Sequence, residues 1–331
     1  MKLSLQPLYC SGLILQGEKP VRIVGNGEGE IFVEINGLKI VTKAENGVWT
    51  ADLPAQPYGG PFTMTVSDGK ETLTLTDVHF GDVFLMAGQS NMQFKMRDGK
   101  PPMAGYIEND HIRLFSPNRI EDTDAYHPQD GWVKCSKNDA PNFTAIGYFL
   151  AQEHYKKTGR AVGLIGCYQG ASVIESWMSE TALQKSGFVC AKEDLHADHF
   201  MENYSAWNKP ASLYTYVFQQ IVSYTFSRVI WYQGESDTTE AEGTVYDKLL
   251  AQMIACWRSD LRDETLPFVI VQIADYDDRR DAGWRAVQEA QLRVEKKLPF
   301  VKTVVSADVC ESDDIHPPTK EWLAKRISDA V

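Results

Sequence analysis

Residues 81–92 read GDVFLMAGQSNM, and the prediction of the fold starts from this stretch. Val83–Ala87 is wholly apolar, as expected for a strand buried on both faces of a sheet. Gly88 then ends the apolar run, and the polar residues Gln89–Asn91 follow directly. In open α/β sheets, ligands bind beyond the carboxyl ends of the strands. The stretch therefore predicts a sheet with functional side chains at one edge, and Ser90 is a candidate nucleophile.

Beyond residue 80, apolar runs alternate with amphipathic helical segments. The predicted strands are Val83–Ala87, Val162–Cys167, Val229–Tyr232, Phe268–Ile273 and Val301–Ser306. The predicted helices cover residues 144–157, 245–261, 282–298 and 319–330. This alternation predicts an α/β domain over residues 79–331, with a mainly parallel sheet and helices on both faces. Residues 179–215 fit neither pattern and are interpreted as a loop-rich insertion.

The first 78 residues have a different pattern. Ile31, Val33 and Ile35 alternate with polar residues and lead into Asn36-Gly37, which is a strong signal for a two-residue hairpin turn. No helical period of any length appears here. We therefore predict a separate β-rich module over residues 1–78, a small all-β sandwich or jelly-roll-like unit.

The composition limits the classes of partner. The chain has 331 residues, of which 43% are hydrophobic and 24% charged, as in an ordinary soluble protein. A formal net charge of −12 argues against nucleic acid or an anionic membrane as the main partner. No apolar segment reaches the roughly 18 residues of a membrane span, so no membrane insertion is expected. The six cysteines are scattered without a CxxC motif, which favours free thiols.

The N-terminal sequence MKLSLQPLYCSG has no long apolar stretch of the kind found in signal peptides. A cytoplasmic location is therefore expected, or an exported one if a signal has been removed. The oligomeric state has no signature in the sequence.

Polar residues gather after four of the five predicted strands. Each of these turns contains side chains that can donate a proton, accept one or attack a substrate. They are Gly88–Met92, Tyr168–Ser172, Gln233–Asp237 and, after the last strand, Ala307-Asp308 followed by Asp313–Pro317. Because the carboxyl ends of parallel strands share one edge of the sheet, these turns are expected to form a single site.

A serine nucleophile needs a general base, which is usually histidine. Among the seven histidines, His316 has Asp313 and Asp314 shortly before it and a predicted helix after it. A short loop of this kind can place a carboxylate on one imidazole nitrogen. It is equally consistent with an Asp-rich helix N-terminus, and the spacing leaves both interpretations open. The His196-x-x-His199 pair has no evident third ligand, so no metal site is expected.

Three blocks of residues resemble those of a known family. Gly88–Met92, Trp231–Ser236 and Asp314–Pro317 are similar to blocks of the sialate O-acetylesterases, which are carbohydrate acetylesterases with the SGNH-hydrolase fold. Further similar stretches include Gly59–Phe62 and Gly163–Ile165, so that the resemblance covers nearly the whole chain. The ordered set of blocks is specific, although each block alone is not. The resemblance implies a flavodoxin-like, three-layer α/β/α domain with a parallel sheet.

The resemblance also implies roles for individual residues. Ser90 corresponds to the nucleophile and His316 to the base. The acid that orients His316 corresponds to Asp313, with Asp314 or a backbone carbonyl as alternatives. The oxyanion hole corresponds to the N–H groups of Ser90 and Gly170, together with a side-chain amide. The wider fold carries Asn in that last position, and here the candidate is Gln233.

Three more side chains are candidates for the pocket wall: Gln89, Glu235 and Trp177. Bracing of loops is the alternative for the two polar residues, and core packing is the favoured interpretation of Trp177. The function implied is removal of O-acetyl groups from acetylated carbohydrates, either sialic acid or polysaccharide side groups, through an acetyl-enzyme on Ser90. No cofactor is implied. The alternatives are an esterase or thioesterase for non-sugar acyl groups and a carbohydrate-binding protein with an inactive site.

Overall fold

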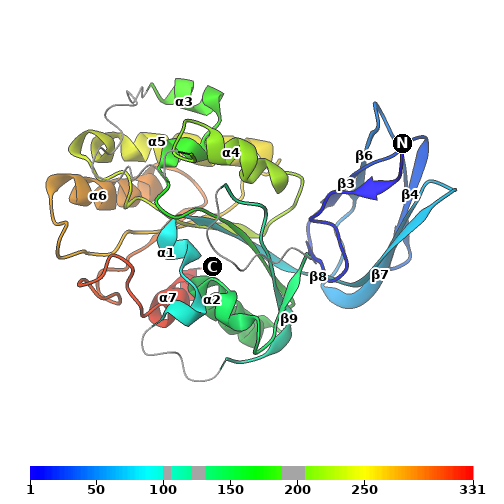
Figure 1. The fold of residues 1–331 in the computed structure, drawn as a ribbon, viewed down its shortest axis with the longest axis horizontal. Coiled ribbons are helices and arrows are strands. Elements are labelled where there is room, and N and C mark those ends of the chain that lie inside the picture. The colour runs from blue at the N-terminus through cyan, green and yellow to red at the C-terminus, as the bar shows by residue number, and fades with distance from the viewer. Residues whose placement is uncertain (100–105, 121–130, 188–205, 331) are drawn as a thin grey trace.

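The computed structural model describes residues 1–99, 106–120, 131–187 and 206–330. Within these ranges, a central sheet follows the strand order β10-β9-β11-β8-β12-β13-β14 (Figure 1). In that order, the strands span Val133–Cys135, Asn109–Phe115, Val162–Tyr168, Thr72–Gly88, Arg228–Tyr232, Phe268–Val271 and Val301–Val304. β10 runs antiparallel to β9, and the pairs from β9 to β14 are parallel. The architecture is a mixed α/β fold with a large sheet.

All five predicted apolar strands lie in this sheet, and the last two end two residues earlier than predicted. The order places β8 between β11 and β12. The turns that follow these three strands therefore lie side by side at the carboxyl edge. Strand β9, which contains His111, pairs with β11 and was not among the predicted strands.

Four long helices agree with the four predicted segments. They are α2 (Ala145–Thr158), α5 (Glu240–Asp260), α6 (Ala282–Lys297) and α7 (Glu321–Ala330). α5 and α6 lie on one face of the sheet and α2 and α7 on the other (Figure 1). None of the described helices is both long and apolar enough to cross a bilayer.

The ends of these helices follow from local side-chain chemistry. Asp281 precedes α6, and its carboxylate accepts a hydrogen bond from the N–H of Trp284 at 2.9 Å. Thr239 caps α5 in the same way. Gly159 ends α2 with a φ of 67°, the left-handed conformation that glycine adopts most easily.

The remaining described helices are short. The α-helices are α1 (Ser90–Gln93), α3 (Glu180–Ser186) and α4 (Ser212–Tyr216). The 3₁₀ turns are η1 (Met96–Asp98), η2 (Ala140–Asn142), η3 (Ile174–Trp177) and η5 (Phe218–Gln220). The predicted insertion at 179–215 thus contains helix, and its residues 188–205 lie outside the described ranges, as do His196 and His199.

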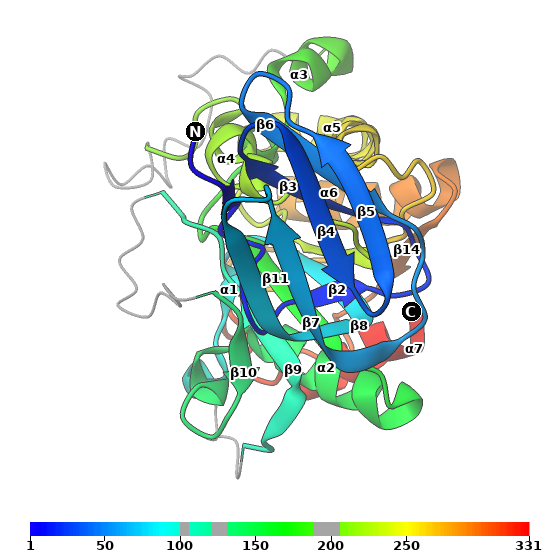
Figure 2. The same cartoon turned by 90° about the vertical axis from the view of Figure 1, so that its right-hand side faces the viewer.

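The N-terminal part is built from β-strands (Figure 2). They are β1 (Ser4–Leu5), β2 (Ile14–Gln16), β3 (Val21–Asn26), β4 (Glu30–Ile35), β5 (Leu38–Lys43), β6 (Val48–Leu53) and β7 (Gly59–Ser67). β1, β3 and β6 form a small sheet, whereas β4, β5 and β7 continue from β8. Ile35 pairs with Leu38 across Asn36-Gly37, both with positive φ, so the predicted hairpin is confirmed.

Strand β8 belongs to both parts of the molecule. Its first half pairs antiparallel with β7, from Thr72 to Phe80. Its second half, Asp82 to Gly88, pairs in parallel with β11. Residues 72–78 were predicted to belong to the N-terminal module and Val83–Ala87 to the α/β domain, and the structure joins both in one strand of 17 residues. The predicted boundary between residues 78 and 79 falls inside this strand, and the division into two domains stays a prediction.

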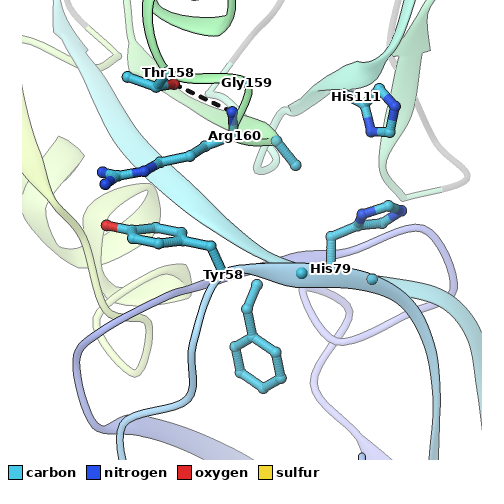
Figure 3. A pocket seen from close by; sticks show the side chains of 10 residues that line it. Tyr58, His79, His111, Thr158, Gly159 and Arg160 are labelled. Carbon is cyan, nitrogen blue, oxygen red and sulfur yellow. Dashed lines mark hydrogen bonds between the residues drawn. The ribbon is translucent and has the colours of Figure 1, made fainter.

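A cavity of about 360 Å³ lies where the N-terminal strands meet α2 and β11 (Figure 3). In it, the Arg160 guanidinium lies over the Tyr58 ring, 3.9 Å from its centroid, and 3.5 Å from the Asp82 carboxylate. His79 Nε2 lies 3.1 Å from the Asp77 carboxylate. These basic groups are therefore already paired with protein groups.

This cavity is remote from the edge that carries Ser90. It borders Ala161, which directly precedes β11, whereas Gly170 follows the other end of that strand. At about 3.3 Å per residue, the seven residues of β11 separate the two ends by roughly 20 Å. The cavity therefore belongs to the junction with the N-terminal strands.

Candidate active site

Ser90 follows a turn that only glycine can make. Gly88 ends β8 with a φ of 137°, and a Cβ there would lie 2.0 Å from the carbonyl oxygen of Tyr232 on β12. The N–H of Gln89 donates to that same oxygen at 3.0 Å. The close contact of the two strands fixes the direction of the turn, and half-buried Ser90 then begins α1.

Gln89 braces the neighbouring turn. Its Oε1 accepts hydrogen bonds from the N–H groups of Gly234 and Ser236, at 3.2 and 3.3 Å. Its Nε2 donates to the Ser236 hydroxyl at 3.3 Å. Because the side chain is buried and engaged at both ends, the bracing interpretation applies, and the pocket-wall role does not.

Gly170, the predicted oxyanion donor after β11, lies beside the candidate nucleophile. A Cβ built on Gly170 would be 3.8 Å from the Cβ of Ser90. The Gly170 N–H donates to the side-chain oxygen of Gln93 at 2.8 Å. A side-chain amide from α1 thus already occupies this N–H, in the way that a bound carbonyl oxygen could.

Gln233 is placed differently from its predicted role. It is fully buried, and its Nε2 donates to the Ser172 carbonyl oxygen at 2.9 Å and to the Asp237 carboxylate. Its Oε1 accepts from the Tyr246 hydroxyl at 2.7 Å. Both amide hydrogens are therefore used inside the protein. Gln233 supports the turn after β11, and it has no hydrogen left for an oxyanion.

The two other candidate pocket residues are also interior. Trp177 is fully buried, packs edge-on against Trp231 and Trp257, and donates to the Ser172 hydroxyl at 2.9 Å. It is a core residue, as favoured from the sequence. Glu235 is buried as well, and its Oε1 accepts a 2.6 Å hydrogen bond from Asn91. Neither side chain is a pocket wall.

The loop that carries His316 is joined directly to the Ser90 turn. Asn91 donates a 2.9 Å hydrogen bond through Nδ2 to the carbonyl oxygen of Ile315. Asn91 directly follows Ser90, and Ile315 directly precedes His316. The fold therefore places the turn that carries Ser90 beside the loop that carries His316.

The surroundings of His316 favour the neutral imidazole. Burial lowers the pKa of His316 below its ordinary value of 6.5, and the nearby ammonium of Lys320 lowers it further. The Asp314 carboxylate acts in the opposite direction. A neutral imidazole at neutral pH is the form that can accept a proton from serine.

The structure distinguishes the two candidate acids. Asp314 accepts a 2.9 Å hydrogen bond from the backbone N–H of His316, and its charge acts on the imidazole. Asp313 is exposed. Within the described residues, neither carboxylate is hydrogen-bonded to the imidazole ring. The contacts therefore favour the alternative acid, Asp314, over Asp313.

Three buried carboxyl groups lie beneath these turns: Glu175, Asp237 and Glu242. Asp237 accepts hydrogen bonds from the N–H of Ile174, at 3.1 Å, and from Gln233. Burial raises the pKa of Glu175 to about 7 and that of Asp237 well above its usual range, and the charge of Glu242 adds to both shifts. Because these pKa values are raised, the buried carboxyls are accommodated by keeping protons.

This cluster predicts that stability falls as the pH rises. The folded protein keeps protons that the unfolded chain releases, so the contribution is complete below the ordinary glutamate pKa of 4.5 and is lost toward pH 7 and above. Glu175→Gln, which is neutral at every pH, should flatten this slope. Urea unfolding between pH 5 and 8 measures it, with exposed Glu264→Gln as the control. Equal slopes in wild type and Glu175→Gln would contradict the prediction.

Sequence reasoning missed two residues of this site, Gln93 and Lys320. Lys320 is fully buried directly before α7, and its Nζ donates to Asn91 Oδ1 at 2.6 Å. A cation at a helix N-terminus is electrostatically unfavourable, and this could have marked Lys320 as unusual. Gln93 has no comparable signal.

Comparison with known proteins identifies the family of this chain. A family model described as "Carbohydrate esterase, sialic acid-specific acetylesterase" matches residues 80–331. Human and rat sialate O-acetylesterases are each 24% identical over 86% of this chain. The chain spans 60% of the length of the human protein and 63% of the rat protein.

Solved structures show the same likeness. A carbohydrate acetylesterase from Xanthomonas citri superposes with a TM-score of 0.86 at 30% identity, over 99% of this chain and 74% of that one. A protein from Arabidopsis thaliana shares the fold at 19% identity, with a TM-score of 0.53 over 76% of this chain and 97% of that one. From the match over residues 80–331, the chain belongs to the sialic acid-specific acetylesterase family of carbohydrate esterases.

Proposed function

We propose that this protein is a serine esterase that removes O-acetyl groups from acetylated carbohydrates through an acetyl-enzyme on Ser90. The observation that carries the proposal is the hydrogen bond between Asn91 and Ile315, because it holds the Ser90 turn against the His316 loop. The human relative, named a sialate O-acetylesterase, and the Xanthomonas citri carbohydrate acetylesterase support the substrate class.

The reaction proceeds by acyl transfer in two halves. Ser90 Oγ attacks the acetyl carbonyl carbon while His316 takes its proton. The bond to the sugar oxygen then breaks, and that oxygen leaves with the proton from His316. Water attacks the acetyl-enzyme, again giving a proton to His316. Acetic acid departs and releases its proton to solvent as acetate, and the proton held by His316 returns to Ser90 Oγ.

The oxyanion is stabilised by two backbone donors. The N–H of Ser90 is the first of α1, so it has no partner within the helix. The second donor is the Gly170 N–H, which the substrate carbonyl reaches by displacing Gln93 Oε1. Each donor of this kind contributes about 10²–10³-fold to the rate. We assign Gln233 a supporting role under the Gly170 turn.

The proposal includes a specific layout of the two parts of the molecule. The parallel order from β9 to β14, with helices on both faces, supports the SGNH-type, flavodoxin-like α/β/α layout. The strands β1 to β7 support a small β-sandwich or jelly-roll-like module before it. The hydrogen bonds of Asp82 to Gln16, Tyr58 and His154 indicate that this module packs against the catalytic part.

The proposal is tested by measuring acetate release from O-acetylated sialic acid and from acetylated xylan. A reaction stopped in acid should carry one acetyl group on the peptide that contains Ser90. The peptides that contain Ser172 and Ser236 are the internal controls, because both serines also occur in Gly-x-Ser. An acetyl group on either control peptide, or none on Ser90, would contradict the mechanism.

Other outcomes point to the alternative functions. Turnover of small esters or thioesters by Ser90, without release of acetate from either sugar substrate, would indicate an esterase for non-sugar acyl groups. Sugar binding without any turnover would indicate a carbohydrate-binding protein.

Asp314→Asn is expected to lower kcat/KM by about tenfold, because the Asp314 charge favours the imidazolium that forms during attack. The same loss should lower the pKa of His316 and move the acidic limb of the pH–rate profile to lower pH. Asp313→Asn is the matched control, since Asp313 is as exposed as Asp314 whereas the described contact with His316 is that of Asp314, and its profile should match that of wild type. The reverse ranking would return the role to Asp313.

A further inference from the structure

Lys320 is a buried ammonium group in the middle of the proposed site. Its side chain is fully inaccessible, and it lies over the rings of Phe94 and Tyr232, with Nζ 5.0 and 5.5 Å from their centroids. Its described hydrogen bond is the 2.6 Å contact with Asn91 Oδ1. Burying an ammonium is costly unless it is paired or hydrogen-bonded. The arrangement therefore requires that Asn91 keep its oxygen turned toward Lys320.

This requirement fixes the orientation of the Asn91 amide. An ammonium can only donate hydrogen bonds, so the amide must present Oδ1 to Lys320 and Nδ2 to the opposite side. Nδ2 then donates to the Ile315 carbonyl at 2.9 Å and to Glu235 at 2.6 Å. One amide thus connects the segment after Ser90, the turn after β12 and the loop that carries His316.

Four titratable groups act on Lys320 from the segments around it. Glu235 lies on the turn after β12, and Cys310, Glu311 and Asp314 lie on the loop after β14. Burial lowers the pKa of Lys320 to about 8, and these four groups oppose that shift. The ammonium form therefore still predominates at pH 7, where it can act on Asn91.

We propose that Lys320 is a positioning residue for the Ser90–His316 pair, because its ammonium fixes the Asn91 amide that holds the His316 loop against α1. This inference rests on the proposed function. The Lys320 side chain is fully inaccessible, so it makes no contact with substrate, and its loss disturbs the alignment of nucleophile and base. The chemical step is therefore affected more than substrate binding.

The test is a double-mutant cycle on hydrolysis of 4-nitrophenyl acetate. Lys320→Met and Asn91→Ala should each lower kcat by about 10- to 100-fold, with KM changed by less than about threefold. The double variant should be no worse than the poorer single variant, because both substitutions break one connection. Additive losses, or losses confined to KM, would overturn the proposal.

The pH profile separates positioning from a general structural role. Removal of the ammonium should move the acidic limb of the Lys320→Met profile to higher pH, because the charge that disfavours protonated His316 is gone. Lys320→Arg keeps the charge, so its limb should stay at the wild-type position while kcat is partly restored. If Lys320→Met does not fold, Asn91→Ala carries the test, and a wild-type kcat in that variant overturns the inference.

Lys325→Met is the matched control. Lys325 lies on α7, is exposed, and its ammonium lies 5.7 Å from the centroid of the Trp322 ring. This variant should keep wild-type kcat, KM and pH profile. Ser90→Ala in the same assay separates the two proposals: if it is inactive and Lys320→Met behaves as wild type, only the positioning role fails. If Ser90→Ala is fully active, the proposed function fails and the positioning role fails with it.

Discussion

Ser90→Ala is expected to lower kcat/KM for 4-nitrophenyl acetate by at least about 10³-fold, because no other group in the site replaces the attacking hydroxyl. His316→Ala should cause a comparable loss, since it removes the base that accepts the serine proton. The two residues act as a unit, so the double variant should be about as active as either single variant. Initial rates at saturating and subsaturating ester, at pH 7.5, measure these effects.

Ser236→Ala is the control for the loss of a serine hydroxyl nearby. Ser236 follows β12 in the sequence Gly-Glu-Ser, and its hydroxyl accepts a 3.3 Å hydrogen bond from Gln89. Loss of one weak hydrogen bond should cost about 1 kcal/mol at most, which leaves activity within about tenfold of wild type. A Ser236→Ala variant as inactive as Ser90→Ala would move the nucleophile to the turn after β12.

Gly88→Ala is expected to destabilise the protein by roughly 3–5 kcal/mol. The added methyl group would lie 2.0 Å from the Tyr232 carbonyl oxygen, and the φ of 137° is strained for any residue with a Cβ. Both causes act on the backbone, which cannot move without separating β8 from β12. The free energy of unfolding, measured in urea, should fall by this amount, and the midpoint should shift while the m-value stays constant.

Gly159→Ala is the matched control for that prediction. Gly159 also has a positive φ, of 67°, but a Cβ added there meets nothing within 4 Å. It should lose only about 1 kcal/mol, the usual cost of left-handed backbone outside glycine. If both variants lose the same amount, the contact between β8 and β12 is looser than the structure indicates.

Strands and turns were predictable from the sequence where the local pattern of apolar residues matches the burial of their side chains. Val83–Ala87 and Val162–Cys167 are continuous apolar runs because both faces of a parallel sheet are covered, and the structure buries both completely. The Asn36-Gly37 turn was predictable because few residue pairs adopt positive φ at both positions. The continuity of β8 over residues 72–88 was not predictable from the sequence. It depends on two distant hydrogen-bonding partners, β7 for the first half of the strand and β11 for the second.

The site was predictable only in part, for a related reason. Strand order determines that the turns after β8 and β11 meet, so Ser90 and Gly170 could be named as neighbours. The direction of an amide is decided by its hydrogen-bonding partners in the folded chain, and Ser172, Asp237 and Tyr246 turn Gln233 inward. Whether Asp313 or Asp314 contacts the His316 segment depends on the conformation of the loop, and a loop has no hydrophobic periodicity from which that conformation could be predicted.

The continuity of β8 has a consequence for any shortened form of the protein. Thr72–Val78 has β7 as its hydrogen-bonding partner, and β2 continues the pairing from His79 to Gly81. A chain without residues 1–71 would keep the site residues but expose a bare, extended edge on the strand that leads to Ser90. Such an edge recruits other chains, so aggregation would remove this form from solution before its chemistry could be measured.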